Sequence, residues 1–113
     1  MAVQQEVPGL IRTDLQRQDL SVPGREVIQN RVDIETAAPA IRHWHPGEEI
    51  IYVLEGTLEY EIDGEPTATV SAGEALTVPS EAVHSVRNVG DGNAAELATY
   101  VVEKDKPLLN LAR

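Results

Sequence analysis

Apolar and polar residues alternate along much of this chain, which is the pattern of β-strands with one buried face. Between Glu26 and Glu35 the apolar positions Ile28, Val32 and Ile34 fall on one face of an extended strand. Similar short strands are expected at residues 43–45, 50–54, 57–62, 67–70, 76–78, 83–88 and 94–102. Glycine, proline, aspartate and asparagine separate these segments, and no sustained helical period is visible. The pattern therefore predicts an all-β barrel or sandwich.

Two glycine-containing segments predict hairpins within this all-β domain. Asp63-Gly64 separates two of the expected strands and favours a tight primed turn. Residues 90–93, with the sequence Gly-Asp-Gly-Asn, precede the long final strand and predict a second hairpin turn.

The chain has 113 residues, enough for one domain with a single core. We assign the barrel to residues 25–103 and an N-terminal arm to residues 1–24. The arm contains two Pro-Gly turns, and its apolar residues predict either a short strand or a helical turn. Residues 104–113 form a C-terminal tail whose three leucines predict packing on the barrel.

The composition excludes several classes of function. The net charge is −10, from 19 acidic and 9 basic side chains, so binding to nucleic acid or to an anionic membrane surface is not expected. No apolar run approaches the ~20 residues of a membrane span, and the N-terminus lacks a signal-peptide layout. The absence of cysteine excludes disulfides, thiolate metal ligands and a cysteine nucleophile. A soluble cytoplasmic protein is expected.

All three histidines lie in two short stretches, one of which also contains a suitably spaced glutamate. His43 and His45 are two residues apart, so on a strand both imidazoles leave the same face. Glu49 follows a Pro-Gly turn and opens the next apolar run, from which its carboxylate can return beside the imidazoles. His84, later in the chain, is the fourth candidate. Imidazoles and a carboxylate together are ligands for a borderline divalent metal.

These residues and their spacing resemble the two motifs of the cupin superfamily, in particular of small single-domain microbial cupins. The first motif is matched, from its histidines onward, by His43, His45, Glu49 and Gly56. The second is matched by Gly73, Pro79, His84 and Asn88. The sequence departs from the family at two positions, where Ala37 and Glu81 replace glycines. Glycine at position 81 would supply a positive φ, which glutamate adopts only at a cost.

The resemblance implies a double-stranded β-helix, or jelly roll, with a metal inside one mouth of the barrel. In this family an N-terminal arm often adds a strand that packs on a partner subunit. A homodimer is therefore expected, also because a small acidic barrel with an apolar arm would gain from pairing its edge strands.

Three neutral imidazoles and one carboxylate leave two positions of an octahedral divalent ion for a substrate that chelates through two oxygens. The donor atoms do not choose between Mn, Fe, Ni, Cu, Zn and Co. Glu49 has two possible roles, as a permanent ligand or as a general base towards the substrate. Cupin dioxygenases that act on flavonols, which this sequence resembles, use the equivalent glutamate as a base. The resemblance thus implies a metal-dependent, dioxygenase-like enzyme acting on a small oxygen-rich organic substrate.

Fold and ligand set alone do not determine the reaction, since other cupins with these ligands are decarboxylases, isomerases or lyases. A second hypothesis is a metal-containing binding or sensor module without turnover. A third is a purely structural cupin with an empty site, against which the intact ligand set argues.

Strand parity suggests which side chains form the substrate pocket. Counting by twos from Glu49 and from His84, and adding neighbouring strands, gives Ile51, Val53, Tyr60, Val86 and Tyr100. Most of these residues are apolar, which fits an apolar or aromatic substrate. The alternative is that they only fill the core of the barrel.

Overall fold

The computed structural model of the protein describes residues 3–112 and confirms the all-β architecture. Its strands are β1 (Val3–Val7), β2 (Leu10–Asp19), β3 (Arg25–Ile34), β4 (His43–Trp44), β5 (Gly47–Glu55), β6 (Thr57–Ile62), β7 (Ala68–Ser71), β8 (Ala75–Val78), β9 (His84–Asn88), β10 (Ala94–Glu103) and β11 (Asn110–Leu111). Within residues 3–112, no helix is long and apolar enough to cross a membrane.

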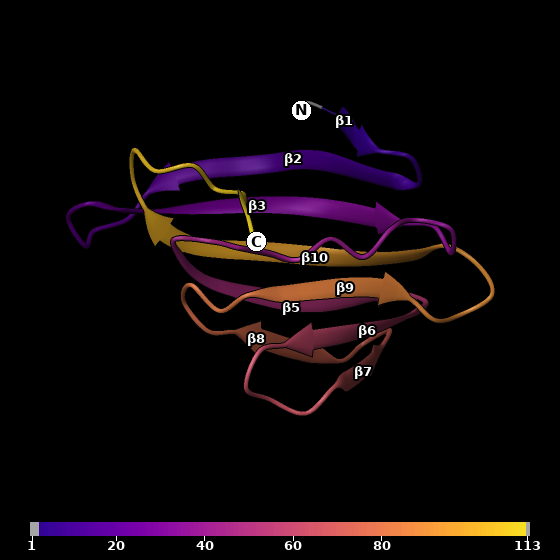
Figure 1. Cartoon of the computed structure of the whole chain (residues 1–113). Helices are drawn as coiled ribbons and strands as arrows, with labels where there is room; N and C mark the ends of the chain where they lie inside the picture. The colour runs from indigo at the N-terminus through magenta and orange to yellow at the C-terminus, as the bar shows by residue number, and fades with distance from the viewer. Residues whose placement is uncertain (1–2, 113) are drawn as a thin grey trace.

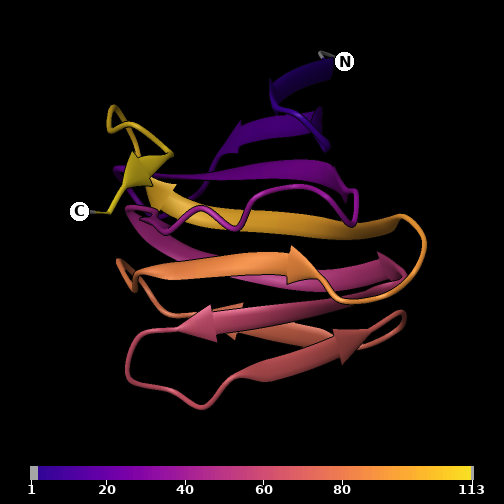
Figure 2. The same cartoon turned by 45° about the vertical axis from the view of Figure 1, so that its right-hand side comes forward.

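The strands form two antiparallel sheets that face each other as a jelly roll (Figure 1). The larger sheet has the order β1-β2-β3-β10-β5-β8, and the smaller has the order β11-β4-β9-β6-β7. Figure 2 shows β9, β6 and β7 of the smaller sheet lying in front of β5 and β8 of the larger sheet. Side chains from the inner faces of both sheets therefore converge on one interior.

Most connections after β3 carry the chain from one sheet to the other, and this corrects one expected hairpin. β9 pairs with β4 and β6, whereas β10 pairs with β3 and β5, so residues 90–93 join two sheets and form no hairpin. Asn88 stabilises this crossover: its amide donates to the carbonyls of Ile34 at 2.8 Å and Gly92 at 2.7 Å. Its side-chain oxygen accepts from the Gly90 amide at 2.9 Å.

The other expected hairpin does form, but without a tight two-residue turn. β6 and β7 pair from Thr57↔Ser71 to Tyr60↔Ala68, and residues 63–67 connect them. Gly64 in this connection has a φ of 84°.

The N-terminal arm is a β-hairpin within the larger sheet. β1 pairs with β2, and β2 pairs along β3 from Leu10↔Ile34 to Asp19↔Glu26. Of the two expected conformations, a strand and a helical turn, the strand is therefore observed. The Pro-Gly turn between β1 and β2 brings Gly9 to a φ of 83°.

The core lies between the two sheets and is mainly aliphatic. Its largest fully buried side chains are Tyr60, Ile34, Ile51, Leu58, Val53, Val78, Val102 and Asn30. On β5 every second residue from Gly47 to Val53 is buried and the residues between are exposed, as the alternation in the sequence predicts. This regular parity directs Glu49 to the interior.

Glu81 adopts a positive φ, the conformation expected for the glycine that the resembling cupin motif has at this position. Its φ is 63°, and its amide donates to the His45 carbonyl at 3.1 Å, so the turn before His84 keeps a tie to the first histidine stretch. A left-handed conformation costs a non-glycine residue about 1 kcal/mol or more.

Replacing Glu81 by glycine is expected to stabilise the protein by about 1 kcal/mol, because the strain at the positive φ is relieved. The greater conformational entropy of glycine in the unfolded chain offsets part of this gain. Urea denaturation would measure the change. Asp105→Gly is the matched control, since Asp105 also has a positive φ, of 64°. Aspartate accepts this conformation more readily, so the gain there should be smaller. A Glu81→Gly variant less stable than wild type would contradict the prediction.

Candidate metal centre

The two sheets bring the four predicted ligands to one interior point. His43 lies on β4 and is paired directly with His84 on β9, while His45 follows β4 and Glu49 lies near the start of β5. One possible ligand atom from each residue lies within 4.8 Å of the others. His45, Glu49 and His84 are buried and His43 is half-buried.

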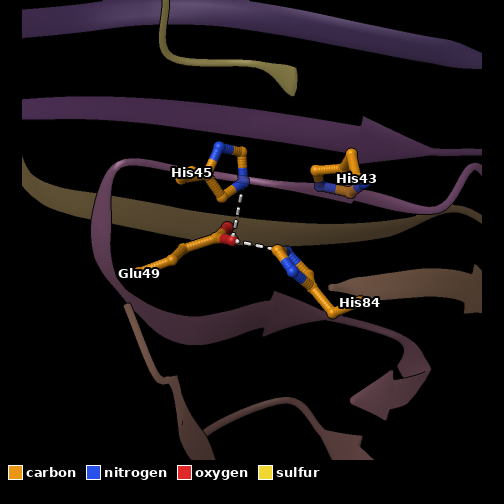
Figure 3. Close-up of side chains that lie close together, drawn as sticks. All are labelled: His43, His45, Glu49 and His84. Carbon is orange, nitrogen blue, oxygen red and sulfur yellow. Dashed lines mark hydrogen bonds and ion pairs between the residues drawn. The ribbon is translucent and has the colours of Figure 1, made fainter. Parts of the chain in front are cut away.

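The Glu49 carboxylate points between the imidazoles, as Figure 3 shows. Its Oε1 lies 3.1 Å from His84 Nε2 and 3.3 Å from His45 Nε2. The rings of His43 and His84 are tilted against each other with centroids 4.3 Å apart. The side chains of three strands and of one strand-connecting segment are thus close enough to share one ion.

Backbone carbonyls hold the far nitrogen of every imidazole. The Nδ1 atoms of His43, His45 and His84 donate to the carbonyls of Ile41 at 2.7 Å, Leu108 at 2.7 Å and Ala82 at 2.9 Å. A carbonyl oxygen only accepts, so each Nδ1 carries a hydrogen and each neutral ring presents a lone pair at Nε2. This is the orientation that carbonyl partners impose on metal-binding histidines.

The Nε2 atoms then face groups that cannot satisfy them without a cation. His45 Nε2 is buried and has no hydrogen-bond partner among the residues that the structure describes. A lone pair at His84 Nε2 would oppose the carboxylate oxygen 3.1 Å away unless a proton or metal ion lay between them. The four residues therefore fit a divalent metal.

In the metal-free protein the electrostatics favour the protonation state that a metal requires at His43 and Glu49 and oppose it at His84. Burial, together with the neighbouring His84, lowers the pKa of His43 to about 4, which keeps this imidazole neutral at neutral pH. Burial alone would raise the pKa of Glu49, but His45 and His84 lower it to about 2, so its carboxylate is ionised. Burial also acts to lower the pKa of His84, and the Glu49 carboxylate raises it above its ordinary value.

A cavity of about 350 Å³ opens beside this cluster, with His43, Glu49 and His84 in its wall. Of the predicted pocket residues, Tyr60, Val86 and Tyr100 line it. Ile51 and Val53 do not, because they lie further along β5 and are fully buried in the core. The remaining wall is mainly aliphatic, from Val7, Leu10, Val32, Ile41, Leu109 and Leu111.

Comparison with known proteins identifies the family. The family model described as "Cupin domain" matches residues 30–102, which is more than half of the chain. The chain belongs to the cupin family. The match includes β4 to β9 and all four residues of the cluster.

Individual curated relatives of this cupin match only part of its sequence. It is 47% identical over 53 residues to "Polyketide synthase CurC" of Streptomyces cyaneus, covering 46% of this chain and 34% of that protein. The curated relatives it matches are longer proteins, of which it covers 34 to 38%.

Among solved structures, a cupin-like protein of Thermotoga maritima superposes with a TM-score of 0.73 at 20% identity, over 91% of this chain and 75% of that one. An oxalate oxidase in complex with the substrate analogue glycolate superposes with a TM-score of 0.70 at 26% identity, over 95% of this chain and 57% of that one.

The cupin's C-terminal tail contributes to the candidate metal centre in a way that the motifs do not indicate. β11 pairs with β4, placing Leu111 opposite His43, and the Leu108 carbonyl is the acceptor for His45. Leu109 and Leu111 form part of the cavity wall. The tail therefore packs on the barrel at the mouth that contains the cluster.

A buried acid, Glu96 on β10, also lines the cavity, and sequence reasoning missed it. Its side chain accepts a hydrogen bond of 2.6 Å from the Tyr60 hydroxyl. Burial, and then the Glu49 charge, raise the pKa of Glu96 to about 8. The signal in the sequence is its parity: Glu96 shares the inward face of β10 with Ala98, Tyr100 and Val102. A charged residue on an otherwise apolar face is the kind of exception that marks a functional position.

Proposed function

We propose that this cupin is a metal-dependent enzyme that acts on a small oxygen-rich organic substrate, with dioxygenase-like chemistry as the leading reaction type. The observation that carries the proposal is the convergence of three carbonyl-anchored imidazoles and one ionised carboxylate at the wall of an apolar cavity. A binding site with few polar groups in an apolar cleft is typical for small organic ligands.

His43, His45, Glu49 and His84 would hold the ion. Once bound, the metal would supply Lewis acidity towards substrate oxygens and, for a redox-active ion, access to oxygen chemistry. The fixed Nδ1 hydrogen bonds keep the imidazoles oriented without reorganisation. Glu49 either remains a ligand or accepts the proton of a substrate hydroxyl, and the aliphatic walls exclude bulk water from that proton.

The comparisons support this reading at the level of chemistry rather than of substrate. The oxalate oxidase structure with glycolate shows that a cupin of similar fold accommodates a small hydroxy acid. The name of the Streptomyces relative points to polyketides, a class of compounds rich in enol and phenol oxygens. Both agree with a substrate that chelates through two oxygens.

Replacing Glu49 by glutamine tests the catalytic role. If Glu49 is the general base, oxygen consumption with an enol or catechol substrate should fall by about 100-fold or more, while metal content stays near that of wild type. Elemental analysis of the purified protein and an oxygen electrode would measure the two quantities. Glu48→Gln is the matched control, because Glu48 is the exposed neighbour on β5 and should change neither.

The two outcomes that contradict this role differ from each other. Parallel loss of metal and turnover would make Glu49 a ligand only. Tight metal binding by wild type, without turnover across enols, catechols and hydroxy acids, would instead favour the second function, a metal-dependent binding or sensor module.

A further inference from the structure

The cavity contains a second polar pair that the metal centre does not use. Tyr60 on β6 and Glu96 on β10 belong to opposite sheets and meet across the interior through the 2.6 Å hydrogen bond. They are 1% and 4% exposed, respectively, yet both line the same cavity as Glu49. Neither residue is among the four candidate ligands.

Burying an acidic side chain at this position costs folding free energy, which argues that Glu96 has a role in binding or catalysis. An ionised carboxylate in this mainly apolar wall loses its hydration, and the hydrogen bond from the Tyr60 hydroxyl offsets only part of that loss. The raised pKa of Glu96 means that a neutral carboxylic acid is the main form at pH 7, although the charge of Arg12, also in the cavity wall, acts to lower that pKa. Burial likewise holds the Tyr60 pKa well above its usual range, so its hydroxyl stays a donor.

The pair offers complementary hydrogen-bonding groups to a hydroxyl. A carboxylic acid has both a donor and acceptor oxygens, and the Tyr60 hydroxyl can accept while it donates to Glu96. The wall of this cavity also contains aliphatic side chains, such as Val32 and Val86, and the charged side chain of Arg12. A ligand that satisfies this environment has an apolar body and a hydroxyl group.

We propose that Tyr60 and Glu96 form a binding subsite for the hydroxyl group of a phenol or enol whose apolar ring fills the cavity. The subsite deepens the proposed function, because it gives the substrate a second oxygen-binding position that is separate from the metal. It rests on the proposed function in one respect, namely that both use the same cavity. Glu96 and Tyr60 are then specificity-determining residues, which select a hydroxylated ring over an apolar ring of the same shape.

The test compares two probes of matched shape, p-cresol and p-xylene, on the full chain as purified. Their dissociation constants are measured by NMR titration of the wild type, of Glu96→Leu, which removes both the donor and the acceptor, and of Tyr60→Phe. One hydrogen bond predicts that wild type binds p-cresol about fivefold to tenfold more tightly than p-xylene, and that this preference falls below about twofold in both variants. Tyr52→Phe, at an exposed tyrosine on the outer face of β5, should retain the preference.

Three results would overturn the subsite. These are equal affinity of wild type for the two probes, no binding of either probe, or a p-cresol preference that persists in both Glu96→Leu and Tyr60→Phe. The last result would place the hydroxyl at the metal end instead. Because the assay measures neither metal content nor turnover, its failure leaves the Glu49→Gln test of the proposed function unaffected.

Discussion

Replacing Gly47 by alanine is expected to destabilise the protein by roughly 3 kcal/mol and to weaken metal binding at the same time. Gly47 opens β5 opposite Val102 of β10, in the middle of the larger sheet. An added Cβ would overlap the Val101 carbonyl oxygen and would lie 2.7 Å from the Val102 Cα. Both contacts are with backbone, so relief requires the strands to separate. Glu49, two residues further along β5, would move with them.

Chemical denaturation and zinc titration of the same variant would test both parts of this expectation. Gly92→Ala is the control, because a Cβ at Gly92 has no atom within 4 Å and should change stability by less than about 0.5 kcal/mol. A Gly47→Ala protein as stable as wild type would show that β5 and β10 can separate at little cost. Normal stability with lost zinc would instead place the whole effect at Glu49.

Local periodicity predicts the all-β class and the positions of His43, His45 and Glu49, whereas the jelly roll and the role of His84 were predicted from the resemblance to the cupin motifs. A strand alternates its faces strictly, so the spacing of His43 and His45 already places both imidazoles on one side. The same rule, applied to the apolar run after Gly47, directs Glu49 inward, where the structure has it. The steric need for Gly47 was not predictable, because it depends on β10, which pairs with β5 from a distant part of the sequence.

Features set by contacts between distant segments escaped prediction. Residues 90–93 have hairpin chemistry, yet the jelly roll sends the strands on either side of them to different sheets. The acceptor for His45 is the backbone carbonyl of Leu108 in the tail. Every residue has a backbone carbonyl, so the residue type gives no sign of this contact. Ile51 and Val53 have the same parity as Glu49, but parity gives only the face of a strand and not the depth along the barrel.

Glu96→Gln should remove a large pH dependence from the stability of the metal-free protein. In the native state the pKa of Glu96 is raised from 4.5 to about 8. Below pH 4.5 the carboxyl is protonated in both states, and its contribution to stability is fully present. As the pH rises from 4.5 towards 8 the unfolded chain releases this proton while the native state retains it, so the native state is progressively destabilised.

The unfolding free energy changes by about 1.4 kcal/mol for each pH unit in this range. Between pH 4.5 and 7, the unfolding free energy of wild type should therefore fall by on the order of 3 kcal/mol relative to that of Glu96→Gln. The quantity to measure is the difference in unfolding free energy between the two proteins, from urea denaturation with a chelator present. His43 acts in the opposite direction, since burial lowers its pKa from 6.5 to about 4 and its contribution is lost as the pH falls through that range. Because His43 is present in both proteins, its effect cancels in the difference.

Glu48→Gln serves as the control for this measurement as well, because the Glu48 side chain is exposed to water in the native state and in the unfolded chain. Its difference from wild type should stay flat across the range. Parallel stability curves for wild type and Glu96→Gln would mean that Glu96 is ionised in the native state at neutral pH. The Tyr60 hydroxyl would then face a carboxylate, and a substrate would meet an acceptor where the neutral acid offers a donor. The slope of this difference therefore reports which hydrogen-bonding partner the cavity presents.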